Sequence, residues 1–351
     1  EEPALKPRSA WTLLGKATPP SLNAPSIAVG AAIYGMDVRP PGLVYAALMQ
    51  SPVHGGRAVS VDSSAALKMA GVHAVLKIDP SETPGSPVKR PPYGMGLVQK
   101  AGAGSGWMIT PADMEATAAQ SAVAVVADHY WQARLALDAV RVTWDSGPGV
   151  AWKTTEQMYD AALSALNEPG EKVIAQRGDI RELEGEGKLV EGTYMTPFCD
   201  QSPIEPLNGT AVVTADGVEL WHPTQEMDGA LWVAADETGL PPEKIKCHQT
   251  LVGGAFGRRF FANDVRMVVA VARRYPGVPV QVIWSREETM RQGRYRPLVA
   301  TRLTARLDAE GLPHAMLARI AGHGISNNGI ADTGYVNGMV PNVRVESRRV
   351  P

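Results

Sequence analysis

The sequence has few residues of the kinds that hold metal ions in proteins. Its 351 residues include two cysteines, Cys199 and Cys247, with no CxxC spacing, which excludes an iron–sulfur cluster or cysteine zinc site within this chain. Seven histidines are scattered without HxxxH or HExxH spacing, so a zinc or iron ion ligated by side chains is not expected. Two interpretations of the cysteines stay open, two buried thiols, which we expect, and a single disulfide.

Long hydrophobic runs and a strong net charge are also absent. No stretch of roughly 18 apolar residues occurs, so no membrane-spanning helix is predicted. The first residues show neither the basic nor the apolar region of a signal peptide. A formal net charge of −2 indicates neither a basic face for nucleic acid nor an acidic tail, and 44% hydrophobic content is typical of a globular protein.

The length predicts about two domains, and breaks in composition divide the chain. Residues 1–28 read as an extended lead-in with scattered prolines. Residues 29–148 and 149–351 follow as two segments with separate cores, because the run SGPGV at 146–150 interrupts the pattern between them. Residues 79–118 are rich in Pro, Gly and Ser and are predicted to form a long loop.

Strand and helix patterns alternate from residue 31. Helical patterns occur at 131–140 and 227–237, and after residue 263, where Asn263 or Asp264 is the expected cap. A short helix is also predicted within 60–71, capped by Asp62 or Ser63 and ended by Gly71. Turn residues at Asp216-Gly217 and Glu310-Gly311 predict two hairpins. Further predicted strands lie at 42–52, 72–78, 121–128, 141–145, 190–198, 243–253 and 278–287.

The run LVGGAFGRRF at 251–260 places glycines 253, 254 and 257 directly after a predicted strand. Glycine is favoured where the backbone turns sharply or approaches another group closely. The run matches neither GxGxxG nor the GxxxxGK of a P-loop, because two arginines follow Gly257. Two interpretations stay open: a simple glycine-rich turn, and a loop whose N–H groups face a bound ligand.

A second strand-to-helix turn precedes this loop in the sequence. The run LWHPTQEM places Gln225 where a strand ends and a helix begins. Two such turns at one sheet edge are a usual location for a ligand. The alternative for Gln225 taken alone is a hydrogen bond that starts the helix.

These two turns carry a resemblance to a known family. Residues 223–260, from PTQEM to GGAFGRRF, closely resemble the molybdenum-binding large subunit of the xanthine dehydrogenase/aldehyde oxidase family. GGxFGRR in place of the xanthine enzymes' GGGFGGKE is most similar to the isoquinoline 1-oxidoreductase beta-subunit branch. The resemblance implies an α+β fold, with an α/β hammerhead domain at 29–148 and the first part of the molybdenum-cofactor-binding domain at 149–351.

The resemblance also implies roles for the two turns. In this family a pterin dithiolene holds the metal, so protein groups surround the cofactor without ligating the molybdenum. Gln225 matches a catalytic glutamine that hydrogen-bonds a molybdenum oxygen ligand. Phe256 and Gly257 match a loop that packs against the cofactor, and the small residues Gly253, Gly254 and Ala255 let the loop approach it. For Arg258 and Arg259 two partners stay open, cofactor phosphates and acidic side chains.

The chemistry implied is hydroxylation of an aldehyde or N-heteroaromatic carbon with oxygen from water, with a glutamate base in a later segment of the large subunit. Phe260 stands where xanthine-type enzymes carry a substrate-binding glutamate, which favours an apolar substrate over a purine. The expected cofactor is molybdopterin, as the cytosine dinucleotide. The expected partners are the remainder of the large subunit, a small [2Fe-2S] subunit and a c-type cytochrome.

The resemblance also bears on the cellular location of the protein, and other functions stay open. The branch is often exported, which favours a periplasmic location over a cytoplasmic one. An alternative function is a non-catalytic structural or interaction module of the same fold, inactive as an isolated fragment. A decayed relative that uses the fold for binding is a third.

Overall fold

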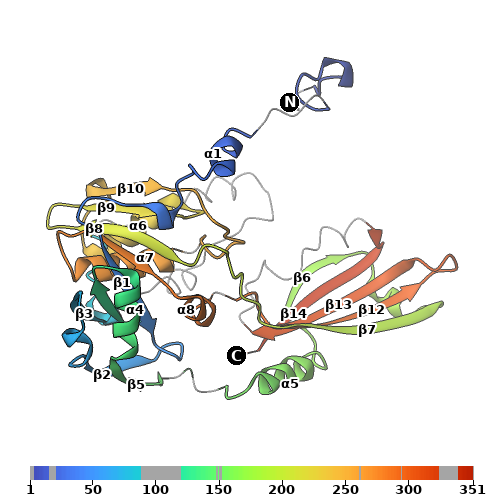
Figure 1. Cartoon of the computed structure of the whole chain (residues 1–351). Helices are drawn as coiled ribbons and strands as arrows, with labels where there is room; N and C mark the ends of the chain where they lie inside the picture. The colour runs from blue at the N-terminus through green and yellow to red at the C-terminus, as the bar shows by residue number, and fades with distance from the viewer. Residues whose placement is uncertain are drawn as a thin grey trace.

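The structure is a computed structural model that describes residues 4–15, 21–87, 120–147, 149, 152–260, 262–293, 295–323 and 339–350. Figure 1 shows two bodies, one built on a seven-stranded sheet and one on a five-stranded sheet. The predicted loop at 79–118 lies for the most part outside the described residues, apart from a 3-10 turn, η4 (Pro80–Glu82), at its start.

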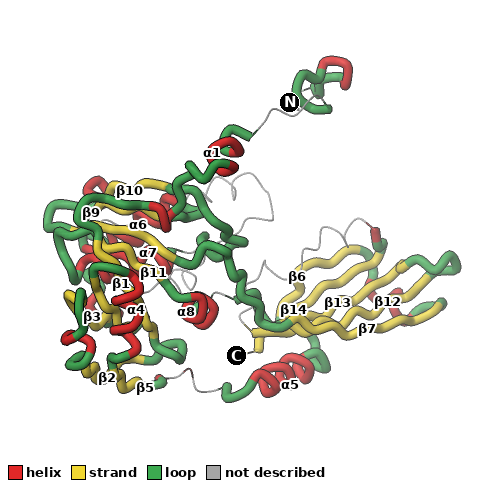
Figure 2. Tube along the Cα trace, viewed as in Figure 1, coloured by secondary structure: helices red, strands yellow, loops and turns green. Residues whose placement is uncertain are grey.

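The seven-stranded sheet combines strands from both sequence segments. In spatial order its strands are β10 (Ile245–Gln249), β9 (Val218–His222), β8 (Asn208–Val213), β11 (Val280–Ile283), β1 (Val44–Gln50), β4 (Ala122–Ala127) and β3 (Val72–Ile78). Its helices are α4 (Tyr130–Asp138), α6 (Met227–Thr238), α7 (Asn263–Arg273) and α8 (Arg286–Arg291). Figure 2 shows these helices around the strands.

Burial on both faces explains the apolar runs of the central strands. All six residues of β4 are buried. Ala122, Ala124 and Val126 face the core under α6 and α7, whereas Val123 and Val125 face the core under α4. A strand covered by helices on both faces needs apolar residues at every position, which is why β4 shows no alternation.

The prediction of separate cores on either side of residues 146–150 is wrong. One hydrophobic cluster contains Ala46 and Ala124 from before this break together with Val268 and Val282 from after it. The cause is the parallel pairing of β1 with β11, which places strands from both segments side by side. The second segment is itself divided, because it also supplies the five-stranded sheet.

The five-stranded sheet has its own clusters of buried residues. One face packs on α5 (Thr155–Ala165) through Ala162, Leu166 and Ala300. Its strands in spatial order are β6 (Lys172–Arg177), β14 (Asn342–Val350), β13 (Pro313–His323), β12 (Val299–Leu307) and β7 (Lys188–Thr196). A further pair, β2 (Arg57–Asp62) and β5 (Arg141–Asp145), forms a two-stranded sheet.

Two local expectations need correction. The helix predicted between Asp62 and Gly71 is a single 3-10 turn, η3 (Ala66–Lys68), which follows the end of β2. α7 begins at Asn263 after Ala262, and no side chain caps it. Both cysteines are free, but Cys199 is exposed and Cys247 half-buried, so the expectation of two buried thiols is also wrong.

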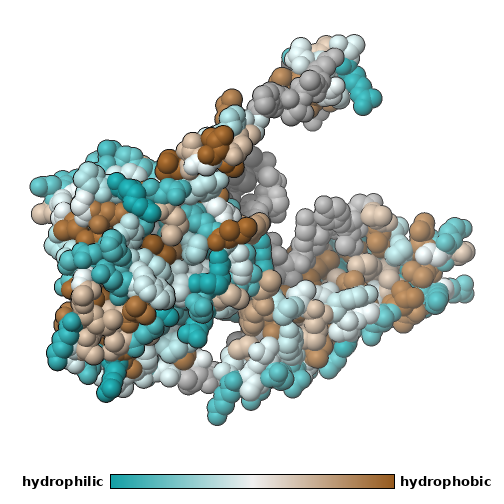
Figure 3. Space-filling view, in the orientation of Figure 1, coloured by the Kyte–Doolittle hydropathy of each residue, from teal (hydrophilic) through white to brown (hydrophobic). Residues whose placement is uncertain are grey.

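The lead-in before β1 lies largely on the outside. It contains the turn η1 (Arg8–Ala10) and the short helix α1 (Ala24–Ala28), and Figure 3 shows hydrophobic residues over α1. Leu22 and Val29 are 96% and 79% exposed. In the described part of the chain, no helix has the length and apolarity needed to cross a membrane.

A buried carboxylate joins α6 to α7. Glu237 is 1% exposed, and its oxygens lie 3.3 Å from Arg273 Nη2, 3.5 Å from Arg266 Nη1 and 3.9 Å from Arg274 Nη1. Thr83 Oγ1 donates to the same carboxylate at 2.9 Å, which ties the segment after β3 to both helices. Arg266 and Arg274 also pair with Asp236 at 2.7 Å and with Glu82 at 2.6 Å, so Arg273 and Thr83 depend most on the Glu237 carboxylate.

We predict that Glu237→Ala lowers the free energy of unfolding by about 1 to 3 kcal/mol, because Arg273 and Thr83 lose their carboxylate acceptor, while Arg266 and Arg274 keep Asp236 and Glu82. Urea unfolding measures this. Glu310→Ala, at an exposed hairpin turn, is the control and is expected to change stability by less than about 0.5 kcal/mol. Equal effects of the two substitutions would contradict the prediction.

Candidate functional site

Five strands of the seven-stranded sheet end at one edge, and β3 is one of them, since β3 and β1 are both antiparallel to β4. β10 runs parallel to β9, β1 runs parallel to β11, and β8 is antiparallel to both β9 and β11. The carboxyl ends of β1, β3, β9, β10 and β11 therefore point the same way. The turns that follow these ends form the edge where open α/β sheets usually bind ligands.

The two turns singled out in the sequence are hydrogen-bonded to each other at this edge. The carbonyl of Arg259 accepts from Gln225 N and from Thr224 Oγ1, both at 3.1 Å. Gln249 Nε2, at the end of β10, donates to the Thr224 carbonyl at 2.9 Å. The Gln225 turn and the glycine loop thus form one unit.

Gln225 is not the residue that caps α6. The N-cap is Glu226, whose carboxylate accepts from Gly229 N–H. The Gln225 side chain is exposed and makes no hydrogen bond with the described residues. Its amide is therefore available to a ligand at the sheet edge.

The glycine loop has an unusual backbone. Gly254 and Gly257 have φ of 104° and 86°, and Phe256 has φ of 54°, a region that a side chain disfavours. Arg296 Nη2 donates to the Phe256 carbonyl at 3.0 Å and so supports this conformation. The backbone N–H groups of residues 254–257 have no acceptor among the described residues.

The two arginines of the loop point inward. Arg258 is 1% exposed, and its guanidinium donates to Asn263 Oδ1 at 3.0 Å and to the Gln292 carbonyl at 3.4 Å. Burial lowers the pKa of Arg258. Neither partner is an acidic side chain, one of the two kinds of partner that the sequence left open, and contact of Arg258 with a cofactor stays a prediction.

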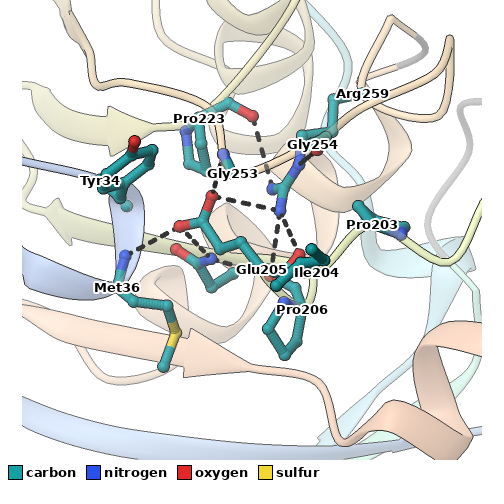
Figure 4. Close-up of polar contacts among 12 residues, drawn as sticks. Tyr34, Met36, Pro203, Ile204, Glu205, Pro206, Pro223, Gly253, Gly254 and Arg259 are labelled. Atoms are coloured by element: carbon teal, nitrogen blue, oxygen red, sulfur yellow. Dashed lines mark hydrogen bonds and ion pairs between the residues drawn. The ribbon is translucent and has the colours of Figure 1, made fainter. Parts of the chain in front are cut away.

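Arg259 is 0% exposed and binds mainly backbone carbonyls. Its guanidinium donates to Gly254 at 3.2 Å, Pro223 at 3.4 Å, Glu205 at 2.8 Å and Pro206 at 3.0 Å (Figure 4). Backbone outside helices and strands lacks the regular hydrogen bonds that pair carbonyl groups in those elements. Here the planar guanidinium of Arg259 donates to four such carbonyls.

Sequence reasoning missed Glu205, which faces this guanidinium. Its Oε2 lies 3.6 Å from Arg259 Nη2 and accepts from Gly253 N at 2.8 Å. A glutamate between two prolines, as in PIEP, was the available signal, but nothing local shows that its partners lie in the glycine loop.

Two buried titratable groups follow or end strands of this sheet, His222 as the last residue of β9 and Glu288 within α8 after β11. Burial lowers the pKa of His222, at the end of β9, to about 4, and the nearby Asp264 carboxylate, 3.7 Å from Nε2, opposes this shift. Burial raises the pKa of Glu288 on α8 to about 7, and a 2.6 Å hydrogen bond from Gln50 N opposes this shift. At neutral pH, His222 is uncharged.

Comparisons with known proteins agree with this architecture. Residues 29–148 match the model of the aldehyde oxidase and xanthine dehydrogenase α/β hammerhead domain. Residues 166–349 match the model of the molybdopterin cofactor-binding domain. The chain belongs to the xanthine dehydrogenase/aldehyde oxidase family.

Several members of this family are similar over most of the chain. Isoquinoline 1-oxidoreductase subunit beta from Brevundimonas diminuta is 28% identical over 311 residues, which are 86% of this chain and 34% of the relative. The molybdenum-binding subunit of an aldehyde oxidoreductase from Escherichia coli (strain K12) is 23% identical over 83% of this chain and 37% of its own length. The chain thus spans about a third of the length of these curated relatives.

Solved structures of the family share the fold. The aldehyde oxidoreductase of Desulfovibrio gigas superposes with a TM-score of 0.67 at 20% identity, over 94% of this chain and 38% of that protein. Quinoline 2-oxidoreductase of Pseudomonas putida 86 gives 0.65 at 20% identity, over 93% and 43%.

The residues at the sheet edge fit a molybdopterin group. Free N–H groups on residues 254–257 offer donors to anionic oxygens, as a concave backbone with positive φ does. The exposed Gln225 amide adds a donor and an acceptor beside them. A Cβ on Gly253 would lie 2.5 Å from Cβ of Glu205, so glycine there is required by packing within the protein.

We predict that Glu288→Gln changes how stability depends on pH. The carboxyl of Glu288 binds its proton more tightly in the folded state, since its pKa is about 7 there against an ordinary 4.5. The stability that this proton contributes is present below pH 4.5 and is lost as pH rises through about 7, by roughly 3 kcal/mol in full. Glutamine keeps an acceptor for Gln50 N–H without acquiring charge, so the variant is expected to be the more stable protein at pH 8.

Urea unfolding of both proteins at pH 5 and pH 8 measures this difference. Glu287→Gln, on the exposed side of the same helix, is the matched control, because hydrogen bonds to Glu287 N–H and to Ser285 lower the pKa of Glu287. An advantage of Glu288→Gln that does not grow between pH 5 and pH 8 would refute the assignment.

Proposed function

We infer that this chain supplies the hammerhead domain and the first part of the molybdenum-cofactor-binding domain of a molybdenum hydroxylase large subunit. The reaction is hydroxylation of an aldehyde or N-heteroaromatic carbon with oxygen from water. The observation that carries this proposal is the unit formed by the exposed Gln225 side chain and the free N–H groups of residues 254–257. Proteins similar to this chain include isoquinoline, quinoline and aldehyde oxidoreductases.

The chain's own residues bind and orient. When bound, the molybdenum cofactor supplies the oxygen-transfer and redox chemistry of the hydroxylation. Gln225 offers a hydrogen bond to an oxygen at the reacting centre, and the loop from Gly254 to Gly257 presents backbone donors to the cofactor. Donors fixed in advance stabilise charge that develops during reaction without reorganising.

Apolar side chains near the loop favour an apolar substrate. Ile204 and Phe256 are 91% and 63% exposed, and Phe260, half-buried, stands where xanthine-type enzymes carry a glutamate. Pro203 lies beside the Phe256 ring, since both come within 3.4 Å of a Cβ built on Gly254. An aromatic heterocycle or an aldehyde with an apolar group suits such a surface better than a purine does.

The proposal includes partners and a cofactor form. The cofactor would be molybdopterin cytosine dinucleotide, and the partners that would accept its electrons are a small [2Fe-2S] subunit and a c-type cytochrome. The exposed aliphatic side chains of the lead-in, such as Leu22 and Val29, offer apolar surface for contact with another subunit. The relatives named as subunit beta and as the gamma subunit of a dehydrogenase complex support assembly of this kind.

We predict that Gln225→Ala in the complete enzyme lowers the single-turnover rate by about 10² to 10³, because one preorganised donor is lost. Molybdenum content and melting temperature are expected to stay at the wild-type values, since the Gln225 side chain is exposed and caps nothing. Rapid-reaction kinetics and metal analysis measure these quantities.

Glu226→Ala is the control, since it removes the real cap of α6. It is expected to cost about 1 kcal/mol of stability with a much smaller change in rate. Wild-type turnover in Gln225→Ala with molybdenum retained would exclude Gln225 from the reacting centre.

The alternative, a non-catalytic module, is tested with the chain by itself. We predict that residues 1–351 purified alone retain no molybdenum and show no hydroxylase activity, because an open site with Gln225 and Phe256 exposed cannot exclude water or position a substrate. Metal analysis with the mass of the purified chain measures this. Stoichiometric molybdenum in the isolated chain would contradict the prediction. A complete subunit without molybdenum would favour the non-catalytic module.

A further inference from the structure

Glu205 joins two segments that are far apart in the sequence. It is 8% exposed, and Oε1 accepts from Met36 N at 3.1 Å and from Asn208 Nδ2 at 3.0 Å. Oε2 accepts from Gly253 N at 2.8 Å, and Glu205 N donates to the Gly253 carbonyl at 3.0 Å. Figure 4 shows the carboxylate between the Met36 segment and the glycine loop.

The position needs a carboxylate and not merely a polar side chain. Three N–H donors and the guanidinium of Arg259, 3.6 Å away, all face the two oxygens. A carboxylate accepts on both oxygens, whereas a glutamine of the same shape presents an NH₂ group on one side. Whichever way that amide turns, buried donors lose their acceptor.

Arg259 connects Glu205 to the Gln225 turn through hydrogen bonds. Its guanidinium binds the carbonyls of Glu205 and Pro223, the latter two residues before Gln225. Its own carbonyl accepts from Gln225 N at 3.1 Å. A shift of Glu205 would therefore reach both Gly253 and the Gln225 turn through direct hydrogen bonds.

Backbone strain concentrates around the same contact. In the described part of the chain, the non-glycine residues with positive φ are Ser202, at 40°, and Phe256, at 54°. Each lies three residues from one of the two hydrogen-bonded residues, Glu205 and Gly253. Strained backbone persists only where its surroundings hold it in place.

We propose that Glu205 is a positioning residue, which acts through Gly253 and Arg259 to hold the glycine loop and the Gln225 turn in the conformation that receives the cofactor. This inference rests on the proposed function for its catalytic consequence. Its structural part concerns the described residues themselves.

The test is Glu205→Gln in the complete enzyme. Backbone amide exchange in peptides containing Gly253 and Gln225 is expected to become roughly fivefold faster or more, the equivalent of one hydrogen bond of about 1 kcal/mol. kcat is expected to fall by about 10- to 100-fold with KM little changed, the range seen when a supporting hydrogen-bond partner is lost. Hydrogen exchange with mass spectrometry and steady-state kinetics measure the two effects.

Glu346→Gln is the matched control. Glu346 is also buried, at 3% exposed, and binds Arg319 Nε at 2.6 Å and Arg344 Nε at 3.0 Å, but it lies on β14 of the five-stranded sheet. It is expected to speed exchange in that sheet and leave the Gly253 and Gln225 peptides unchanged. Arg259→Lys is the second variant and should loosen the same two peptides as Glu205→Gln.

Several outcomes overturn the proposal. Wild-type exchange at Gly253 and Gln225 in Glu205→Gln would do so, as would faster exchange spread evenly over the chain. Failure of both Glu205→Gln and Arg259→Lys to fold would assign the pair to the fold as a whole and not to the loop. A wild-type enzyme without molybdenum or hydroxylase activity would remove the proposed function, while the exchange data would still decide the role of Glu205.

Discussion

The parallel pairing of β1 with β11 is the constraint on which the rest of the structure depends. Val44 pairs with Val280 and Ala47 with Ile283, which joins the two sequence segments in one sheet. The same pairing makes β1 and β3 end at the edge where β9, β10 and β11 end. Without it, the Gln225 turn and the glycine loop would not share a core with the hammerhead segment. Bringing β1 and β11 together closes the long stretch of chain between them, which costs conformational entropy. The hydrophobic core that both strands share offsets this cost.

Charged groups are buried at this edge because the backbone there is irregular. Strands and helices satisfy their own carbonyls, whereas the segments around Pro206, Pro223 and Gly254 do not. Arg259 supplies the missing donors from one planar group, and Glu205 supplies the matching acceptors. Burying such groups costs several kcal/mol each, and the gain is a backbone held in one conformation. In GGAFGRRF, glycine permits the positive φ of Gly254 and Gly257, and Arg259 holds the loop in this conformation through its hydrogen bond to the Gly254 carbonyl.

Local patterns in the sequence predicted helices and strands correctly where an element is buried along its whole length. They failed where few residues of a segment are buried. The apolar run of β4 and the periodicity of α7 predicted their elements, because each is covered by neighbours along its length. The pattern at 60–71 was misleading, since Ala66 is the single buried residue of this region and one buried residue makes no apolar stripe. The six-residue helix α8 was missed, because so short a helix presents no complete apolar stripe.

The sequence by itself determined the elements with strong periodicity, the two hairpin turns, the position of Gln225 at a strand-to-helix turn, and the family through GGAFGRRF. These features depend on residues within a few positions of one another, so their physical causes are visible locally. The tertiary structure decided the strand order, the shared core, and the partners of Glu205. Met36 and Glu205 are separated by 169 positions, and nothing near either residue specifies the other. Such contacts arise only when the packing of the whole sheet brings the segments together, because hydrogen bonding acts over a few ångströms in space and not along the chain.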